Sequence, residues 1–329
     1  MKGTVMSGMR PTGRLHIGHL SVLHNWVRLQ EEYRCFFVIV DWHALTTSFD
    51  ETEGIKENVR EMFLDWLSVG LDPGRSAIFV QSQVKEHAEL HLLLSMVTPV
   101  SWLERCPTYK EQIAELGREG KDISTYGFLG YPLLMAADIL VYRADTVPVG
   151  RDQLPHLELC REVARRFNYL YGVRLLPEPQ ALLSSVPVVP GIDGRKMSKS
   201  YHNYIGLTDS PEEIRSKVRM MITDPARIRK TDAGHPEVCT VFTYQGLFNP
   251  QEVPRIEDEC RRGAIGCVAC KALLAERLVE GLRPVWEKRQ QLAARPDDLA
   301  DMLEEGARRG RAAASQTMVA VREAMRILP

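Results

Sequence analysis

Two short segments of this chain carry side chains suited to hold a polyphosphate. His16 and His19 are three residues apart, between a predicted first strand and the helix that follows it, and Gly18 stands between them. Imidazole N–H groups at a helix N-terminus can donate to phosphate oxygens, and a glycine there lets a purine approach the backbone. Taken alone, the pair is explained equally well by two ordinary histidines on a surface helix.

The second segment is a lysine-rich loop. Lys196 and Lys199 belong to the sequence Lys-Met-Ser-Lys-Ser at 196–200, which Gly191 and Gly194 precede. Two lysines on one loop suit a phosphate chain whose negative charge grows in a transition state. The alternative is a basic surface loop, but a five-residue match to this sequence arises by chance in only about one chain in 10⁴.

The elements around these segments predict an α/β fold. Short apolar runs alternate with amphipathic helices, which is typical of a Rossmann-like parallel sheet covered by helices. The expected strands are 4–9, 35–40, 77–81, 146–149 and 182–189, and the expected helices are 15–30, 55–69 and 152–167. In such sheets, ligands bind outside the carboxyl ends of the strands, where the first histidine segment lies.

Two helical regions interrupt and follow this alternation. Residues from about 101 to 143 read as a helical insertion, which would serve as a subunit interface or a cap over the site. After residue 200 the chain is mostly helical, and Ser210 followed by proline and Glu213 predicts a helix start. We expect a catalytic domain at 1–206, with a signature loop at 193–204, and an all-helical domain at 207–329. The cluster Arg308, Arg309 and Arg311 is interpreted as a solvated face.

Composition argues against a membrane or secreted protein, but it does not identify a binding partner. The chain has 329 residues, 44% of them hydrophobic, and a formal net charge of −1, which neither requires nor excludes a nucleic-acid partner. No apolar run approaches the ~18–20 residues of a membrane span, and residues 1–10 lack a secretory signal. We therefore expect a cytoplasmic protein, with no membrane partner and with reduced thiols.

Four of the seven cysteines cluster in the helical half. Cys239, Cys260, Cys267 and Cys270 are separated by 20, 6 and 2 residues, and Gly263 and Gly266 would help the chain wrap round an ion. The Cys-x-x-Cys pair is common in metal sites, but the spacing is not the paired pattern of a zinc ribbon. A Cys₄ zinc site, a [4Fe–4S] cluster and free thiols all remain open.

Taken together, the two signature segments resemble those of class I aminoacyl-tRNA synthetases, in the tryptophanyl/tyrosyl subgroup. The order, the spacing and the short length agree with that subgroup, and the resemblance runs through nearly the whole chain. Three further segments resemble the tryptophanyl members: 41–46 (Asp-Trp-His-Ala-Leu-Thr), 131–140 (Tyr-Pro-Leu-Leu-Met-Ala-Ala-Asp-Ile-Leu) and 147–153 (Val-Pro-Val-Gly-Arg-Asp-Gln). The cysteine spacing is similar to that of an iron–sulfur-carrying bacterial subset, in which the cluster has a structural role.

The resemblance implies how the amino acid is selected. An indole N–H is only a donor, so a buried carboxylate such as Asp138 suits it, and Met135 on the same helical face would contact the ring. Tyrosyl enzymes usually place a tyrosine and a glutamine where Met6 and Met135 stand, which disfavours a tyrosyl-tRNA synthetase. The residues expected to bind tryptophan are Met6, His43, Tyr131, Met135, Asp138 and Gln153.

The implied activity is the formation of tryptophanyl-adenylate from L-tryptophan and ATP, followed by transfer to tRNA(Trp). The expected catalytic residues are His16, His19, Lys196 and Lys199. The expected ATP-binding residues are Arg10, Pro11, Thr12, Gly18, His19, Gly150, Arg151, Asp152, Val186, Lys196, Met197, Ser198, Lys199 and Ser200. Lys110 is a weaker candidate for the phosphates.

The resemblance implies that the helical domain at 207–329 binds the tRNA anticodon and carries the Cys₄ site. It also implies cofactors and an assembly. Mg²⁺ is expected on the pyrophosphate oxygens, a [4Fe–4S] cluster is expected on the four cysteines with zinc as the lesser possibility, and the subgroup is homodimeric. The alternatives are a tyrosyl-tRNA synthetase, a non-catalytic paralogue that binds tRNA or amino acid, and another adenylyl transferase with the same signature.

Overall fold

The computed structural model describes residues 1–118, 121–183, 189–199 and 201–327. They form two compact units, each built from segments that are far apart in sequence. The first unit contains residues 1–13, 24–185 and 295–329, and the second contains residues 14–23 and 186–294. This division differs from an expected boundary at 206/207, because the last helix of the chain packs within the first unit and residues 14–23 belong to the second.

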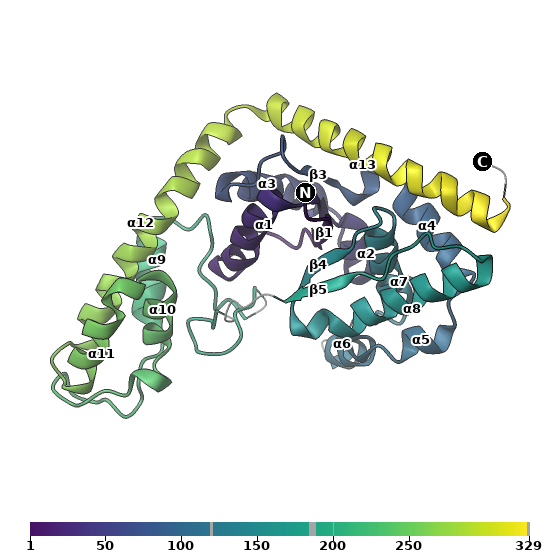
Figure 1. The fold of residues 1–329 in the computed structure, drawn as a ribbon. Helices are drawn as coiled ribbons and strands as arrows, with labels where there is room; N and C mark the ends of the chain where they lie inside the picture. The colour runs from purple at the N-terminus through teal and green to yellow at the C-terminus, as the bar shows by residue number, and fades with distance from the viewer. Residues whose placement is uncertain (119–120, 184–188, 200, 328–329) are drawn as a thin grey trace. The chain divides into compact units, whose positions relative to one another are not determined.

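The first unit is built on a parallel five-stranded sheet with the order β3-β2-β1-β4-β5 (Figure 1). Its strands are β1 (Thr4–Met9), β2 (Arg34–Ile39), β3 (Ala77–Val80), β4 (Thr146–Val149) and β5 (Gln180–Leu183). The chain reverses its strand order beside the central strand β1, which is the place where open α/β sheets bind ligands. The predicted Rossmann-like fold class is confirmed.

Helices and single 3₁₀ turns connect the strands of this unit. They are α1 (Leu20–Glu32, whose first turn is counted with the second unit), α2 (Asp41–Ser48), α3 (Ile55–Val69), η2 (Gln81–Gln83), α4 (Glu86–Ser95), α5 (Val100–Glu104), α6 (Pro107–Arg118), α7 (Tyr126–Leu140), η3 (Arg151–Gln153), α8 (Leu154–Tyr171) and α13 (Pro296–Met325). The segment expected to be a helical insertion is α5, α6 and α7.

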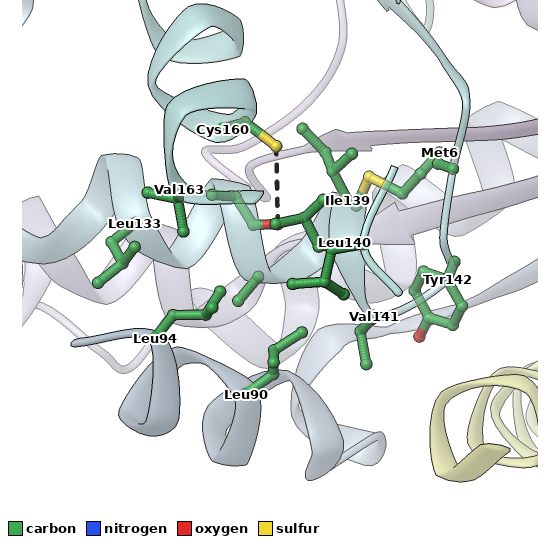
Figure 2. Close-up of a cluster of buried hydrophobic side chains, with 14 of the residues drawn as sticks. Met6, Leu90, Leu94, Leu133, Ile139, Leu140, Val141, Tyr142, Cys160 and Val163 are labelled. Atoms are coloured by element: carbon green, nitrogen blue, oxygen red, sulfur yellow. Dashed lines mark hydrogen bonds between the residues drawn. The ribbon is translucent and has the colours of Figure 1, made fainter. Parts of the chain in front are cut away.

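Helix α7 lies at the centre of the hydrophobic core of the first unit. In Figure 2, Leu90 and Leu94 of α4 approach it from one side and Val163 of α8 from the other, while Met6 reaches it from β1. Ten residues of α7 are buried, so it is apolar nearly all round and not amphipathic. A polar side chain on this helix must therefore find its partners inside the protein.

The last helix, α13, closes one edge of the sheet. It packs against β3 so closely that a Cβ on Gly306 would lie 1.9 Å from the carbonyl oxygen of Ile78. Arg309 donates to the carbonyl oxygens of Pro73 and Ser76, at 2.7 and 3.2 Å. The prediction of a merely solvated face is therefore wrong for Arg309, which anchors this helix to the turn before β3, and for Arg311, which donates to the carbonyl oxygen of Gln83 at 3.2 Å.

The second unit is helical in its described part. It contains η1 (Ile17–His19), α9 (Pro211–Met220), η4 (Pro236–Val238), α10 (Thr240–Phe248), η5 (Pro250–Glu252), α11 (Val253–Arg261) and α12 (Cys267–Ala293). The predicted start at Ser210 is confirmed, because its side chain accepts the N–H of Glu213. Among the described residues of either unit, no helix is both long and apolar enough to cross a membrane.

Two expected elements differ from the structure, and one observed helix was not predicted. The helix predicted from residue 15 begins only at Leu20, because His16 is extended and forms a bridge with Gly206. The last strand ends at Leu183, and residues 184–188 of the expected strand lie outside the described residues. Residues 41–46, for which no element was predicted, form most of helix α2.

Candidate functional site

Asp138 is a buried carboxylate whose oxygens are met from three other segments. Its side chain lies on α7, and only 2% of the residue is exposed. His43 Nε2 of α2 lies 2.9 Å from Oδ2, and His87 Nδ1 of α4 lies 2.7 Å from Oδ1. Gln81 Nε2 donates to both oxygens, at 2.7 and 2.9 Å. A carboxylate offers about four acceptor positions, and three donor groups contact its two oxygens here.

The donors around Asp138 keep it ionised. Burial alone would raise the pKa of this carboxyl, yet the hydrogen bonds from His43 and His87 lower it to about 2. His87 is itself held on its other side, since its Nε2 lies 2.6 Å from the hydroxyl of Tyr142. If His87 Nδ1 donates to the carboxylate, its Nε2 can accept the Tyr142 proton, and the chain of bonds is complete.

The other residues expected to bind the amino acid also lie in the first unit. Met6 of β1 is buried, whereas Met135 is half-buried on α7, one turn before Asp138. The Tyr131 hydroxyl lies 2.6 Å from Nε2 of the buried His156. Gln153 is half-buried in the turn η3 and donates to Asp152 Oδ2 at 3.0 Å. Tyr131, Met135 and Asp138 share one stripe of α7, as the spacing predicts.

A neighbouring stripe of α7 lines an open apolar cavity. The cavity has a volume of about 340 Å³ and lies between α2, α4 and α7. Its lining residues are Trp42, Leu45, Thr46, Phe49, His91, Thr125, Gly127, Gly130 and Leu134. None of the residues expected to bind tryptophan belongs to this lining.

The nucleotide candidates of the first unit follow two neighbouring strands. Arg10, Pro11 and Thr12 come directly after β1, and Gly150, Arg151 and Asp152 come directly after β4. Arg10 and Thr12 are exposed, as are Gly150, Arg151 and Asp152, whereas Pro11 is buried. Val186 lies outside the described residues, and Lys110 is an exposed residue of α6.

The histidine pair lies in the second unit, on an extended residue followed by a 3₁₀ turn. The rings of His16 and His19 are in contact, with their centroids 3.9 Å apart and their planes tilted by 45°. His19 Nδ1 contacts the backbone N and O of His16, both at 3.2 Å, which leaves Nε2 as the nitrogen that can meet a ligand. A Cβ on Gly18 would lie 2.9 Å from His16 Nδ1, so the glycine makes room for this ring.

Both imidazoles are neutral at pH 7. Burial, the neighbouring His19 and Lys199 lower the pKa of His16 to about 3. Burial and Lys199 likewise lower the pKa of His19 to about 4. The pair can therefore donate N–H hydrogen bonds to a phosphate without adding a positive charge, while the lysines of the second signature carry the charge.

The second signature forms a loop on a tight hairpin in the same unit. Pro190 and Lys196 pair in an antiparallel bridge, and the buried Tyr244 of α10 donates to the carbonyl oxygen of Pro190 at 2.5 Å. Met197 is buried, Lys196 is exposed and Lys199 is half-buried. Ser200 lies outside the described residues. The buried methionine anchors the loop, and the lysines flank it.

The four cysteines of the second unit come from three segments. Cys239 precedes α10, Cys260 lies in α11, and Cys267 and Cys270 form the first turn of α12. One guanidinium nitrogen of Arg227 lies 3.7 Å from the sulfur of Cys260 and 3.9 Å from that of Cys267.

The sulfurs gather without forming a closed metal site. All four thiols are free, and burial raises the pKa of Cys270 to about 11. In the described parts of the chain, no group of three or more His, Cys, Asp or Glu side chains is arranged to hold a metal ion. The predicted Cys₄ metal site (Cys239, Cys260, Cys267 and Cys270) is therefore not confirmed as a preformed site, although four free thiols, two of them in contact with one guanidinium, are chemically a suitable donor set.

Comparison with known proteins decides the family. Residues 2–283 match the family of class I tRNA synthetases for tryptophan and tyrosine (W and Y). A tryptophan–tRNA ligase of Thermotoga maritima is 51% identical over 328 residues, covering 98% of this chain and 99% of that protein. The chain belongs to the tryptophan branch of the class I tRNA synthetases. An Aquifex aeolicus tryptophan–tRNA ligase is 44% identical, with 98% of this chain and 99% of that protein covered.

Solved structures of tryptophanyl-tRNA synthetases agree with this assignment. A Campylobacter jejuni tryptophanyl-tRNA synthetase solved with ADP and tryptophan superposes with a TM-score of 0.89 at 33% identity, covering 98% of this chain and 100% of that one. A tyrosyl-tRNA synthetase of Archaeoglobus fulgidus shares the fold at a TM-score of 0.68 and 22% identity, covering 87% of this chain and 90% of that one. The predicted membership in the synthetase family is confirmed, and the iron–sulfur subset stays a prediction.

Sequence reasoning missed several residues that the fold brings to these synthetase signatures. Gln81 and His87 hold Asp138, Tyr142 holds His87, and Asn203 holds the lysine loop. The segment 147–153, which the sequence analysis singles out, contains none of these residues. Asn203 follows the lysine signature closely enough for that position to have been a signal.

Proposed function

We propose that this protein is a tryptophan–tRNA ligase that activates L-tryptophan with ATP and transfers it to tRNA(Trp). The observation that carries the proposal is the buried, ionised Asp138 in the same chain as both phosphate-binding signatures. A fixed acceptor of this kind suits the single N–H of an indole. A phenol would need a site that both donates and accepts.

The first step would be positioning and charge stabilisation without a covalent enzyme intermediate. The tryptophan carboxylate attacks the α-phosphorus of ATP, a new oxygen–phosphorus bond forms, and pyrophosphate leaves. His16 and His19 would donate N–H groups to the phosphates, and Lys196 and Lys199 would stabilise the charge on the departing pyrophosphate. Mg²⁺ would enter with the nucleotide and neutralise part of the phosphate charge.

The remaining site residues would hold the two substrates. Arg10, Pro11 and Thr12 would line the nucleotide, with Gly18, Met197, Ser198, Ser200 and Val186. Gly150, Arg151 and Asp152 would meet the ribose. Met6, His43 and Met135 would surround the indole, while Tyr131 and Gln153 would meet the amino-acid end. In the second step, the terminal ribose hydroxyl of the tRNA attacks the mixed anhydride and AMP leaves.

The decisive experiment is amino-acid-dependent exchange of pyrophosphate into ATP, with tryptophan and tyrosine tested side by side. We expect exchange with tryptophan alone. Exchange with tyrosine would contradict the role given to Asp138, Met6 and Met135. No exchange with either amino acid, in a protein shown to be folded, would favour a non-catalytic paralogue.

The protein would act as a homodimer. Several large apolar side chains are exposed on α4, α5 and the start of α7, which are neighbouring elements of the first unit: Leu92, Met96, Val100 and Tyr126. Exposed apolar groups of this kind mark interaction surfaces. We expect Leu92→Glu combined with Met96→Glu to give a monomer in sedimentation, whereas Tyr169→Glu, at a more exposed tyrosine on α8, leaves the dimer intact.

The four cysteines would bind a structural [4Fe–4S] cluster, with zinc as the lesser possibility. The support is the donor set itself: three segments supply four free thiols, and Arg227 contacts the sulfurs of Cys260 and Cys267, where its charge would favour bound thiolates. Protein purified without oxygen should contain iron and sulfide, and Cys267→Ser should lose both while Cys160→Ser keeps them. A colourless protein with bound zinc, or with no metal, would contradict the cluster.

A further inference from the structure

Asn203 is a buried amide at the base of the lysine loop, with only 2% of the residue exposed. Its Nδ2 donates to Asp193 Oδ1 at 2.8 Å and to the Lys196 carbonyl oxygen at 3.1 Å. Its Oδ1 accepts the backbone N–H of Ser198 at 2.8 Å. Both amide protons are therefore used, and one rigid group fixes the backbone on each side of Met197.

The surrounding backbone is shaped to admit this side chain. A Cβ on Gly191 would lie 2.2 Å from Asn203 Nδ2, so only glycine leaves room for the amide. His202, the residue before Asn203, has a left-handed backbone with φ 50°. Such a conformation is uncommon outside glycine and persists where the surroundings demand it. The chain thus accepts local strain in order to bury Asn203.

The segment that begins at Asn203 also reaches the first signature. Two residues further on, the carbonyl oxygen of Ile205 accepts the N–H of Ile17 at 2.9 Å, and Leu207 donates to Leu15 at 3.0 Å. These bonds flank His16, which itself bridges to Gly206. One short segment therefore holds the lysine loop at one end and the histidine pair at the other.

We propose that Asn203 is a positioning residue that sets the lysine loop, and with it Lys196 and Lys199, in the conformation that stabilises the departing pyrophosphate. This inference rests on the proposed ligase activity. Asn203 would touch neither substrate and would act only through the backbone of residues 196 and 198. Its loss would weaken transition-state stabilisation more than substrate binding, because misplacing a catalytic group by about 1 Å can lower a rate on the order of 10²-fold.

The test exchanges the two side chains that face each other, Asn203 and Asp193. Asn203→Asp keeps the size but sets a second carboxylate against Asp193 and against the Lys196 carbonyl oxygen. We expect kcat for pyrophosphate exchange to fall by about 10- to 10²-fold, with the KM for tryptophan unchanged. Asp193→Asn together with Asn203→Asp restores one donor facing one acceptor and should recover part of kcat. Asp193→Asn alone, which removes an exposed pair with Arg195, should stay close to the parent.

A second readout does not depend on activity. The amide of Ser198 donates to Asn203, so its hydrogen exchange should become faster in Asn203→Ala while the amides of α12 keep their protection. Unchanged kcat in folded Asn203→Asp, a fall in kcat matched by an equal rise in the KM for tryptophan, no recovery in the exchanged pair, or unchanged Ser198 exchange would each overturn the proposal. A parent protein that shows no tryptophan-dependent exchange would instead contradict the proposed function, and the Ser198 measurement would still decide whether Asn203 holds the loop.

Discussion

Asp138 and the lysine loop belong to different units, and the chain holds them in different ways. Asp138 lies on a buried helix and is hydrogen-bonded by side chains from α2, η2 and α4. The lysine loop is held through its backbone by Asn203 and by the buried Met197. One region presents a single fixed charge, and the other presents an exposed and a half-buried lysine on an anchored loop.

The difference follows from what each region would have to recognise. Discrimination between two aromatic rings needs an acceptor that cannot turn away or become protonated, since the wrong ring must leave it unpaired. Departing pyrophosphate is a charge that develops during the reaction, and long cationic side chains on an anchored loop can follow it. Variants should therefore affect the two regions separately: changes at Asp138 act on tryptophan, and changes in the loop act on the rate.

The largest effect is expected at Asp138. Asp138→Ala removes the anion from between His43, His87 and Gln81 and leaves buried donors unpaired, which should lower the free energy of unfolding by about 3–5 kcal/mol. Tryptophan-dependent exchange should be lost as well. Urea unfolding measures the first effect, and Glu158→Gln, at an exposed carboxylate paired with Arg161, should change stability by less than about 1 kcal/mol.

Lys199→Ala should lower the rate of adenylate formation by about 10²–10³-fold, because it removes one charge that stabilises the transition state. Tryptophan binding, which would depend on the first unit, should not change. Single-turnover kinetics and equilibrium tryptophan binding separate the two, with Lys56→Ala on α3 as the exposed-lysine control. Equal losses in rate and in tryptophan affinity would show that the two regions do not act independently.

Tyr142→Phe tests the far end of the Asp138 network. The change removes the hydroxyl that lies 2.6 Å from His87 Nε2 and leaves that nitrogen buried without a partner, which should cost about 1–3 kcal/mol of stability. Without this bond, His87 is held less rigidly against Asp138, which should also raise the KM for tryptophan while the KM for ATP stays the same. Tyr171→Phe, where the ring packs on Phe167, is the matched control. A rise in both KM values would place Tyr142 outside the selection of the amino acid.

The two regions also differ in how much the sequence could predict. The strands at 4–9 and 146–149 and the helix at 55–69 follow directly from apolar patterning and lie where it placed them. Asp138 was predictable through the resemblance of residues 131–140 to the tryptophanyl members, because a buried carboxylate suits the donor-only N–H of an indole. Its partners Gln81 and His87 were not predictable, because they meet Asp138 only after η2 and α4 pack against α7.

The signature loops differ from Asp138 in what the sequence leaves unpredicted. Their residues are recognisable from sequence, but their conformation depends on pairing between distant segments. His16 was expected on a helix, and it is extended because residues 15–17 pair with residues 205–207. Gly18 was expected to make room for a purine, and in the structure its missing side chain makes room for the His16 ring. Local patterning cannot encode such contacts, since the partner segment lies elsewhere in the chain.

The smallest expected effect is on proton binding, and it distinguishes the two regions by pH. The pKa values of His16 and His19 are lowered from 6.5 to about 3 and about 4, so the unfolded chain binds more protons than the folded one below pH 6.5. Their contribution to stability is present above pH 6.5 and is lost as the pH falls from there toward 4 and 3. The pKa of Asp138 is lowered from 3.8 to about 2, so its contribution is lost only between those two values.

A bound polyphosphate changes this balance at the histidines alone. Nearby negative charge raises an imidazole pKa, so binding of ATP at pH 5.5 should be accompanied by proton uptake, whereas binding at pH 7.5 should show little. Calorimetry in two buffers of different ionisation enthalpy measures the protons directly. His19→Asn should reduce the uptake at pH 5.5, and tryptophan binding should take up no protons at either pH, because Asp138 stays ionised throughout this range. Proton uptake with tryptophan alone would mean that the Asp138 network titrates on binding and is not the fixed acceptor that amino-acid selection requires.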